Sequence, residues 1–166
     1  METEAARAEP TTYNLLFVCT GNTCRSPMAE VLARREIDLR GWQNVALRSA
    51  GVAATAGTPA SEQAVSSVGD IGLDLTPHSA TQLDPSLVAW ADLILVMSPS
   101  HLDLIEDLGG VHKAALLGDF VAGTDGRGFP VSDPFGGGRA AYRSTLAELE
   151  RLVAQTVDRI ALVVEP

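Results

Sequence analysis

Short apolar runs alternate with helix-patterned segments along this chain, and this alternation restricts the possible folds more than any other sequence feature. The runs that we expect to form strands span residues 13–18, 45–50, 91–97 and 114–117. Strands that alternate with helices pair in parallel, because each crossover helix returns the chain to the same end of the sheet. The sequence therefore predicts an α/β fold, a single three-layer domain with a parallel sheet and helices on both of its faces.

The predicted helices begin at pairs in which a proline follows a capping residue. We expect Ser26 to cap the first helix, with Pro27 at its first position and Gly41 at its end. The same signature recurs at Thr58-Pro59, Asp84-Pro85 and Ser98-Pro99.

The carboxyl-terminal part of the chain combines a long irregular segment with the clearest helix. Residues 118–138 hold seven glycines and two prolines, and a compact domain rarely keeps so long an irregular segment without a use for it. Apolar residues then recur every three or four positions, at Tyr142, Leu146, Leu149, Val153, Val157, Ile160 and Val164. This spacing predicts one buried stripe on a long amphipathic helix.

Length and charge limit the classes of function. The 166 residues suit one domain, which we place at residues 13–166 after a disordered lead at residues 1–12. The net charge of −9 and the lack of a basic run argue against nucleic-acid binding. No segment approaches the length of a membrane span, and the amino terminus shows no hydrophobic signal region. We therefore expect a cytoplasmic protein without a membrane partner, and a monomer.

The stretch FVCTGNTCRSPMAE, residues 17–30, carries the chemistry that the sequence predicts. Cys19 lies at the carboxyl end of the first strand, where ligands bind in open parallel sheets. Backbone N–H groups of residues 19–26 and the positive end of the following helix would together bind an anion. The Arg25 guanidinium matches two oxygens of a phosphoryl group, so the negative net charge is no obstacle to local phosphate binding.

The same loop predicts a nucleophile. A thiol beside a helix amino terminus and a guanidinium loses its proton easily, and the Ser26 hydroxyl would donate to the thiolate of Cys19. Gly21 allows close backbone approach, and Asn22 tolerates a left-handed conformation. In-line attack of Cys19 on phosphorus would form a phosphocysteine that water later hydrolyses.

A leaving group also needs a proton, and two Asp-Pro pairs supply candidate acids. Asp84 is better explained as a helix cap. Asp133 lies within the glycine-rich segment, where capping explains less, so we expect it to act as general acid and then as general base.

These residues resemble a known family. CTGNTCRS has the C-x5-R-S form, SAG follows at residues 49–51, and DPFGGG lies about 110 residues after the cysteine. The likeness to the low-molecular-weight protein tyrosine phosphatases extends from about Asn14 to Ile160. It implies a four-stranded parallel sheet in the order 2-1-3-4, a phosphocysteine intermediate, phosphorylated protein substrates, and neither metal nor cofactor.

The resemblance also implies roles for individual residues. Cys19 would be the nucleophile, Arg25 the phosphate clamp and Asp133 the acid. The rest of the phosphate-binding loop would be Thr20, Gly21, Asn22, Thr23, Cys24 and Ser26. Ser49 and His78 resemble the members of the network that supports Asn22.

Two departures from the tyrosine-specific members concern the substrate. Thr23 stands where those members usually carry an aliphatic residue, and Phe135 is the one aromatic candidate near the acid, since GVAATAG at residues 51–57 is small and non-aromatic. Both features resemble the protein-arginine phosphatase branch, because a hydroxyl can bond to a guanidinium or orient the water. We therefore expect phosphoarginine as substrate. The alternative is phosphotyrosine, and lesser alternatives are arsenate reduction or a non-catalytic phosphate-binding redox sensor.

The remaining cysteine and the histidines have less specific interpretations. Cys24 suits a packing role or, equally, a redox role in which it forms a disulfide with oxidised Cys19. His78, His101 and His112 lack the spacing of metal ligands. We expect His101 to lie in the first turn of a helix and to face water.

Overall fold

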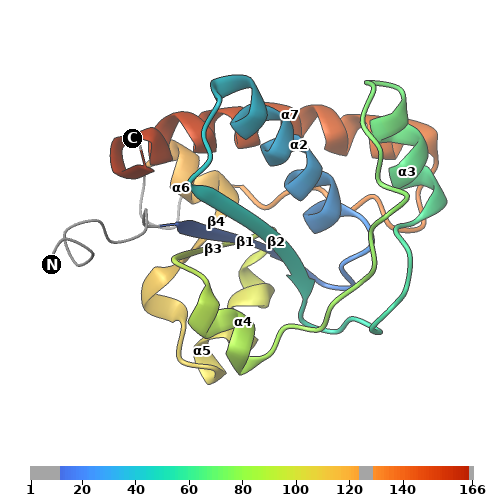
Figure 1. Cartoon of the computed structure of the whole chain (residues 1–166). Helices are drawn as coiled ribbons and strands as arrows, with labels where there is room; N and C mark the ends of the chain where they lie inside the picture. Colours follow the sequence, from blue (N-terminus) through green and yellow to red (C-terminus); the bar gives the residue numbers. More distant parts are fainter. Residues whose placement is uncertain (1–11, 124–128, 165–166) are drawn as a thin grey trace, which may run out of the picture.

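A parallel sheet forms the centre of the structure, a computed structural model that describes residues 12–123 and 129–164 (Figure 1). Its strands are β1 (Tyr13–Cys19), β2 (Val45–Gly51), β3 (Leu93–Val96) and β4 (Ala114–Leu116). All pairs are parallel, and the order β2-β1-β3-β4 confirms the predicted topology. Cys19 pairs with Gly51 at the carboxyl edge, where the predicted site lies.

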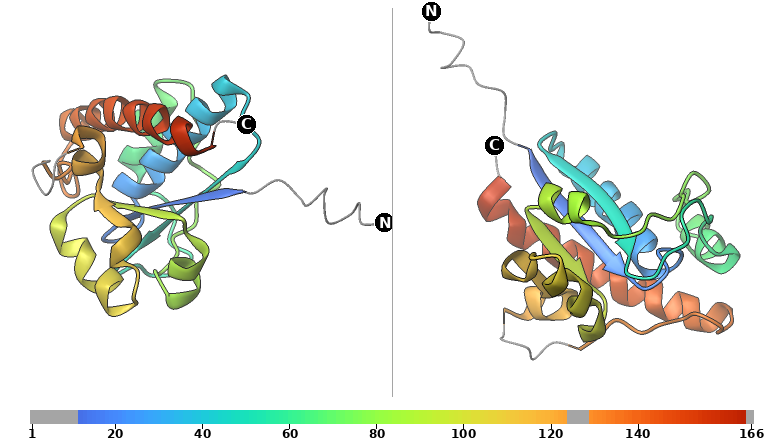
Figure 2. Two further views of the ribbon diagram at one scale, coloured as in Figure 1. Left: turned by 90° about the vertical axis from the view of Figure 1, so that its left-hand side faces the viewer. Right: turned by 90° about the horizontal axis from the view of Figure 1, so that it is seen from below.

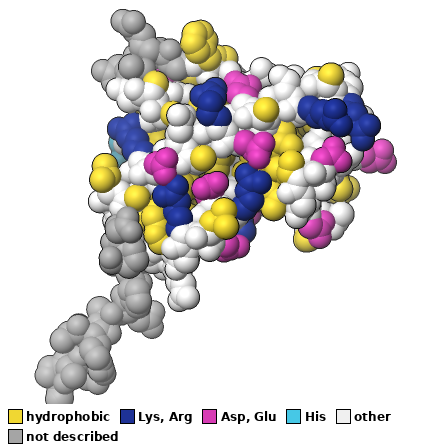
Figure 3. Space-filling view, turned by 90° about the horizontal axis from the view of Figure 1, so that it is seen from above, with side chains coloured by type: hydrophobic (Ala, Val, Ile, Leu, Met, Phe, Trp, Pro, Cys, Tyr) yellow, Lys and Arg dark blue, Asp and Glu magenta, His cyan; other side chains and the backbone are white. Residues whose placement is uncertain are grey.

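One group of helices, which includes the two longest in the described part of the chain, covers one face of this sheet, as the upper part of Figure 1 shows. They are α2 (Arg25–Arg40), α3 (Glu62–Gly69), α6 (Leu117–Ala122) and α7 (Arg139–Val164). The predicted stripe on α7 is confirmed, since every one of its seven residues is buried. On the outer surface of these helices cationic and acidic side chains are interspersed (Figure 3), and several are paired, such as Arg35 with Glu150 at 3.1 Å.

Shorter helices cover the opposite face (Figures 1 and 2). They are α4 (Pro85–Trp90), α5 (Leu102–Asp107) and the 3-10 turns η1 (Pro99–His101) and η2 (Val111–Lys113). β1 serves both layers, because its side chains alternate: Leu15 and Phe17 join the α2–α7 core, whereas Leu16 and Val18 join the α4–α5 core. The three-layer prediction is thereby confirmed.

Two helix starts differ from the prediction. α2 begins at Arg25, after Cys24, so Ser26 lies inside the first turn and does not cap the helix. Its hydroxyl instead lies within hydrogen-bond distance of Cys19 and Asn22. α3 is capped by Ser61, which accepts from the Ala64 N–H at 3.2 Å, and not by Thr58.

Other boundaries agree with the sequence. Asp84 Oδ1 accepts from the Leu87 N–H at 2.8 Å and Pro85 is the first residue of α4, as expected. Gly41 ends α2 with φ 70°, a conformation that favours glycine.

The segment predicted to be irregular, residues 118–138, begins with a helix, because α6 extends to Ala122. Residues 129–138 are irregular, and the Val131 N–H donates to the Met97 carbonyl at 2.8 Å just beyond β3. This bond brings Asp133 to the carboxyl edge of the sheet. The predicted lead falls largely on residues 1–11, which lie outside the described residues. Within residues 12–123 and 129–164, no helix has the length and apolar character needed to cross a membrane.

Candidate active site

The loop that follows β1 is held in shape by a close backbone approach and a left-handed residue. A Cβ on Gly51 would lie 2.9 Å from the Asn22 nitrogen and closer still to the Thr20 carbonyl oxygen, so only glycine fits beside the loop. Asn22 has φ 59°, which asparagine adopts more readily than most residues. Residues 51–53 support the loop from behind, where the Val52 and Ala53 N–H groups donate to its carbonyls at 2.9 Å.

The Asn22 side chain organises a buried hydrogen-bond network. Its Oδ1 accepts from the Thr81 N–H at 2.8 Å, which fixes the orientation of the amide. Its Nδ2 donates to Ser26 Oγ at 2.8 Å and to Ser49 Oγ at 2.9 Å. Asn22 thereby joins the loop, α2 and β2.

The direction of this network leaves a hydroxyl hydrogen near the Cys19 sulfur. Asn22 supplies the proton of its bond to Ser26, so the Ser26 hydroxyl keeps its own proton. Two acceptors compete for this proton, Cys19 Sγ at 2.8 Å and the Ala50 carbonyl at 3.4 Å, and Cys19 is the nearer. The Ser49 hydroxyl likewise donates to Glu30 Oε1 at 2.7 Å. Cys19 is 3% exposed, and its sulfur lies within hydrogen-bond distance of this hydroxyl.

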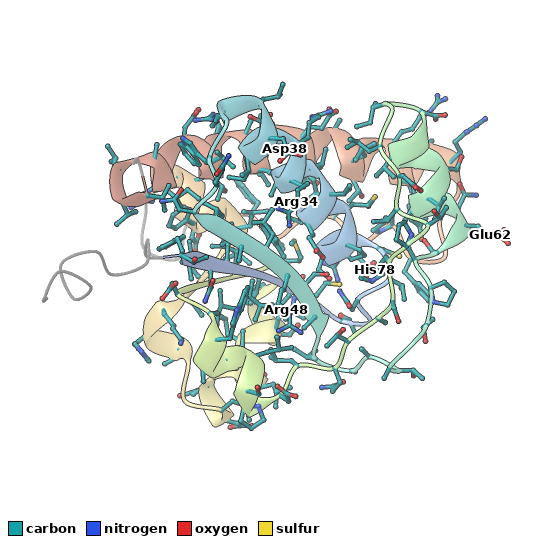
Figure 4. All side chains as sticks on the ribbon, in the orientation of Figure 1. Arg34, Asp38, Arg48, Glu62 and His78 are labelled. Carbon is teal, nitrogen blue, oxygen red and sulfur yellow. The ribbon has the colours of Figure 1, made fainter. Side chains whose placement is uncertain are left out.

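His78 supports the same loop from the linker before α4. Its Nε2 lies 2.7 Å from the Asn22 carbonyl oxygen, and since a carbonyl only accepts, Nε2 carries the proton. Figure 4 shows His78 beside the amino-terminal end of α2. The structure thus brings His78 and Ser49 to Asn22, where the family resemblance predicted them.

Arg25 is buried at the first position of α2 and spans the site. Its Nη1 donates to Ser98 Oγ and to the Val131 carbonyl, both at 3.1 Å. Its Nη2 lies 3.5 Å from Asp133 Oδ2. Among the described residues, none accepts a hydrogen bond from Arg25 Nε. The Nε–H group and an Nη2–H group can therefore donate to two oxygens of an anion.

Asp133 lies at the mouth of a cavity of about 220 Å³. Its side chain is 55% exposed, and its Oδ1 accepts from the Phe135 N–H at 3.1 Å, which leaves Oδ2 toward Arg25. The cavity is lined by Cys19, Thr20, Gly21, Thr23, Cys24, Arg25, Asp133 and Phe135. Phe135 is the aromatic member of this lining, and it is 76% exposed.

The prediction that His101 faces water is wrong. The side chain is 2% exposed, because η1 turns it inward toward the loop, where Nε2 lies 2.9 Å from Thr20 Oγ1. Burial and the Arg25 charge lower the pKa of His101 to about 4. The signal in the sequence is its place three residues after the cap Ser98, from which a side chain can reach back to the cap N–H.

Cys24 has partners that sequence reasoning missed. Its Sγ lies 3.1 Å from the Tyr142 hydroxyl on α7 and 3.5 Å from Ser61 Oγ. Burial and the bond to Cys24 raise the pKa of Tyr142. Tyr142 was assigned to the apolar stripe of α7, and the periodicity that placed it there gives no sign of its hydroxyl partners.

A thiol, a hydroxyl donor, a guanidinium and a carboxylate therefore meet around one anion-sized space. Within the described parts of the chain, no group of three or more His, Cys, Asp or Glu side chains could hold a metal ion. An anion-binding loop with a cysteine nucleophile at the carboxyl edge of a parallel sheet defines a cysteine-dependent phosphatase, and this chain is of that class.

The chain belongs to the family described as low molecular weight phosphotyrosine protein phosphatase, whose model matches residues 14–163. It is 37% identical over 150 residues to a protein-arginine-phosphatase of Geobacillus stearothermophilus, covering 89% of this chain and 96% of the relative. It is also 37% identical over 146 residues to a probable low molecular weight protein-tyrosine-phosphatase of Ralstonia nicotianae, covering 88% of this chain and 94% of that relative.

The solved structures that it resembles carry the same names. A mutant YwlE arginine phosphatase with a phosphorylated active-site serine superposes with a TM-score of 0.82 at 38% identity, covering 89% of this chain and 95% of that one. The YwlE arginine phosphatase of Geobacillus stearothermophilus gives 0.81 at 37% identity over 90% of this chain and 94% of that one. The predicted family is confirmed.

Proposed function

We propose that this enzyme hydrolyses phosphoarginine in proteins, with Cys19 as nucleophile, Arg25 as phosphate clamp and Asp133 as acid and base. The observation that supports the substrate assignment is the presence of Thr23 and Asp133 in the lining of the cavity, where Phe135 is the one aromatic side chain. Relatives named protein-arginine phosphatases support it.

The first step transfers the phosphoryl group to sulfur. Arg25 and the N–H groups of the loop hold the phosphoryl oxygens while Cys19 Sγ attacks phosphorus. The P–N bond breaks, and the leaving guanidino nitrogen takes the proton of the Asp133 carboxyl group. The Ser26 hydroxyl stabilises the thiolate before attack.

The second step releases phosphate. Asp133, now ionised, takes a proton from a water molecule while the water oxygen forms a bond to phosphorus. The S–P bond breaks, inorganic phosphate leaves, and the Cys19 thiolate is restored. Asp133 can serve both steps because its exposed side chain reaches the mouth, where leaving group and water exchange.

Selectivity follows from hydrogen-bond supply. A guanidino group is planar and rich in N–H donors, so it needs acceptors at the mouth. The protonated Asp133 carboxyl group offers its carbonyl oxygen. Thr23 offers a hydroxyl oxygen, whose neighbour in the structure is Cys24 Sγ at 3.7 Å. A phenol ring instead needs apolar surface on both of its faces, and Phe135 provides it on one side.

The direct test compares kcat/KM on matched phosphoarginine and phosphotyrosine peptides. We expect the phosphoarginine peptide to be preferred, and a clear preference for phosphotyrosine would overturn the substrate assignment. Thr23→Val, which removes the hydroxyl at nearly constant volume, and Thr23→Ile should both shift selectivity toward the aryl substrate. Thr23→Ser is the matched control, and it should keep the preference.

Phosphotyrosine is the second candidate, favoured by the family description and by Phe135 at the mouth. In that case Phe135→Ala should raise KM for phosphotyrosine peptides severalfold. Under the phosphoarginine assignment, Phe135→Ala should alter the two substrates similarly.

We also propose that the protein acts as a cytoplasmic monomer that binds no nucleic acid and that oxidation joins Cys19 to Cys24. Both cysteines are free thiols five positions apart, and a thiolate nucleophile needs a reducing compartment. Light scattering at micromolar concentration tests whether the protein is a monomer, and cell fractionation tests its compartment. A mobility-shift titration with duplex DNA and with RNA tests whether it binds nucleic acid. After peroxide treatment, peptide mapping should detect a Cys19–Cys24 cross-linked peptide, and its absence would refute the redox role.

A further inference from the structure

His101 is a buried imidazole for which the proposed reaction has no use. It lies in η1, between β3 and α5, and both of its ring nitrogens are engaged. Nδ1 accepts from the Ser98 N–H at 3.1 Å, and Nε2 lies 2.9 Å from Thr20 Oγ1. Thr20 directly follows the nucleophile and lines the cavity.

The partners decide the tautomer. A backbone N–H only donates, so Nδ1 carries no proton, and the neutral ring places its proton on Nε2. Nε2 therefore donates to Thr20 Oγ1. Since the Thr20 oxygen receives this bond, its hydroxyl hydrogen remains available to an acceptor in the cavity. A pKa of about 4 keeps His101 neutral near pH 7 and agrees with this geometry.

Ser98 gives the same ring a second line of action. Its N–H binds His101, and its Oγ accepts from Arg25 Nη1 at 3.1 Å. His101 thus holds Ser98, which accepts a hydrogen bond from Arg25, through Nδ1. It holds Thr20, the residue after Cys19, through Nε2. Thr20 and Arg25, which His101 reaches directly and through Ser98, lie toward opposite ends of the anion-binding loop.

We propose that His101 is a positioning residue of the phosphatase reaction, which it serves by fixing Thr20 as a hydrogen-bond donor to the phosphoryl site and Ser98 as the seat of Arg25. The proposal rests on phosphoryl transfer at Cys19 and not on the choice between phosphoarginine and phosphotyrosine.

Two substitutions at His101 each remove one of its two hydrogen bonds and keep the other. In His101→Asn the side-chain oxygen takes the place of Nδ1, so the Ser98 bond is kept and the Thr20 bond is lost. In His101→Gln the side-chain nitrogen takes the place of Nε2, so the Thr20 bond is kept and the Ser98 bond is lost. Thr20→Val removes the hydroxyl and Thr20→Ser keeps it. His112→Gln, at an exposed histidine, is the control for substitution itself.

Kinetics on p-nitrophenyl phosphate and inhibition by inorganic phosphate should distinguish the loss of the Thr20 bond from the loss of the Ser98 bond. We expect His101→Asn and Thr20→Val to lower kcat about fivefold to tenfold, the effect of one lost hydrogen bond. The inhibition constant of phosphate should rise by a smaller factor, because bound phosphate loses the same Thr20 donor. The double variant should be no slower than Thr20→Val, and Thr20→Ser should restore the rate. His101→Gln should instead weaken phosphate binding by a similar factor and keep kcat.

The proposal is overturned if both His101 variants lower kcat and phosphate affinity in parallel with their melting temperature while Thr20→Val is silent, since His101 would then serve packing alone. Nitrogen NMR of the imidazole gives an independent readout, because a proton on Nδ1 at pH 7 contradicts the assignment. If the wild-type protein hydrolyses no phosphate compound, the proposed function fails. In that case phosphate binding and the tautomer still test His101, and unchanged phosphate affinity in His101→Gln overturns its role.

Discussion

The two sides of the active site are built differently. On the loop side, Cys19 and Asn22 are buried and bonded to α2, β2 and the linker before α4. On the acid side, Asp133 and Phe135 are exposed. Their segment is held by Val131, which bonds to Met97 and Arg25, and by Ser132, which bonds to Thr145 and Glu148 on α7. A phosphoryl group in this site would meet a buried loop that is already held in shape, whereas the proposed proton donor lies on a segment that solvent can reach.

This difference should separate binding from chemistry. Substitutions in the Asn22 hydrogen-bond network of the loop side should change anion binding, stability and rate together, because this network shapes the loop. Substitutions on the acid side should change rate alone. Four measurements test this comparison.

The largest effect is expected for Cys19→Ser, because a serine hydroxyl is a far weaker nucleophile than a thiolate. We expect kcat to fall by at least about a thousandfold. The folded variant should still bind inorganic phosphate, measured by calorimetry, because Arg25 and the loop amides remain. Cys24→Ser is the matched control and should retain most activity; equal losses in the two variants would contradict a single nucleophile.

The next effect tests the acid side. Asp133→Asn should lower kcat by about a hundredfold, the typical contribution of a general acid. Phosphate affinity should stay equal or become tighter, because a negative charge leaves the neighbourhood of Arg25. Asp84→Asn, at a helix cap, is the control and should keep the rate. A parallel loss of phosphate affinity in Asp133→Asn would contradict the comparison, because the acid side would then contribute to anion binding as the loop side does.

The Asn22 network should show the opposite behaviour. Asn22→Ala removes three hydrogen bonds and places alanine at φ 59°, so we expect a loss of about 2–3 kcal/mol in unfolding free energy. Both kcat and phosphate affinity should fall with it. Asn22→Gly accepts the backbone conformation and should be the more stable variant by about 1 kcal/mol, as urea denaturation would show. Equal stabilities would remove backbone strain from the account.

The smallest effect concerns pH. The pKa of His101 is about 4 when folded against about 6.5 when unfolded, because burial and Arg25 outweigh the opposing charge of Asp133. The unfolded chain therefore binds the extra proton first, and stability should decline as pH falls from 6.5 toward 4. Between pH 7 and 5.5 we expect a loss of about 1 kcal/mol. His101→Gln should lack this component, and an identical decline in that variant would assign it elsewhere.

The sequence by itself determined the strands, most helices and the core of the reaction centre. Period-two and period-3.6 patterns are local, so β1 and the α7 stripe follow from neighbouring residues. Cys19 and Arg25 are likewise linked by a loop short enough that their proximity follows from chain geometry.

Only the tertiary structure decided which distant side chains complete the site. Ser98 and His101 reach the loop because they follow β3, the strand that pairs with β1. Tyr142 reaches Cys24 because α7 packs against α2. The sequence likewise predicted Ser26 as a helix cap, whereas in the structure its hydroxyl lies beside Cys19 Sγ. The physical reason is that these contacts depend on how helices seat on the sheet. Helix seating is set by packing summed over many side chains, and no local periodicity records it.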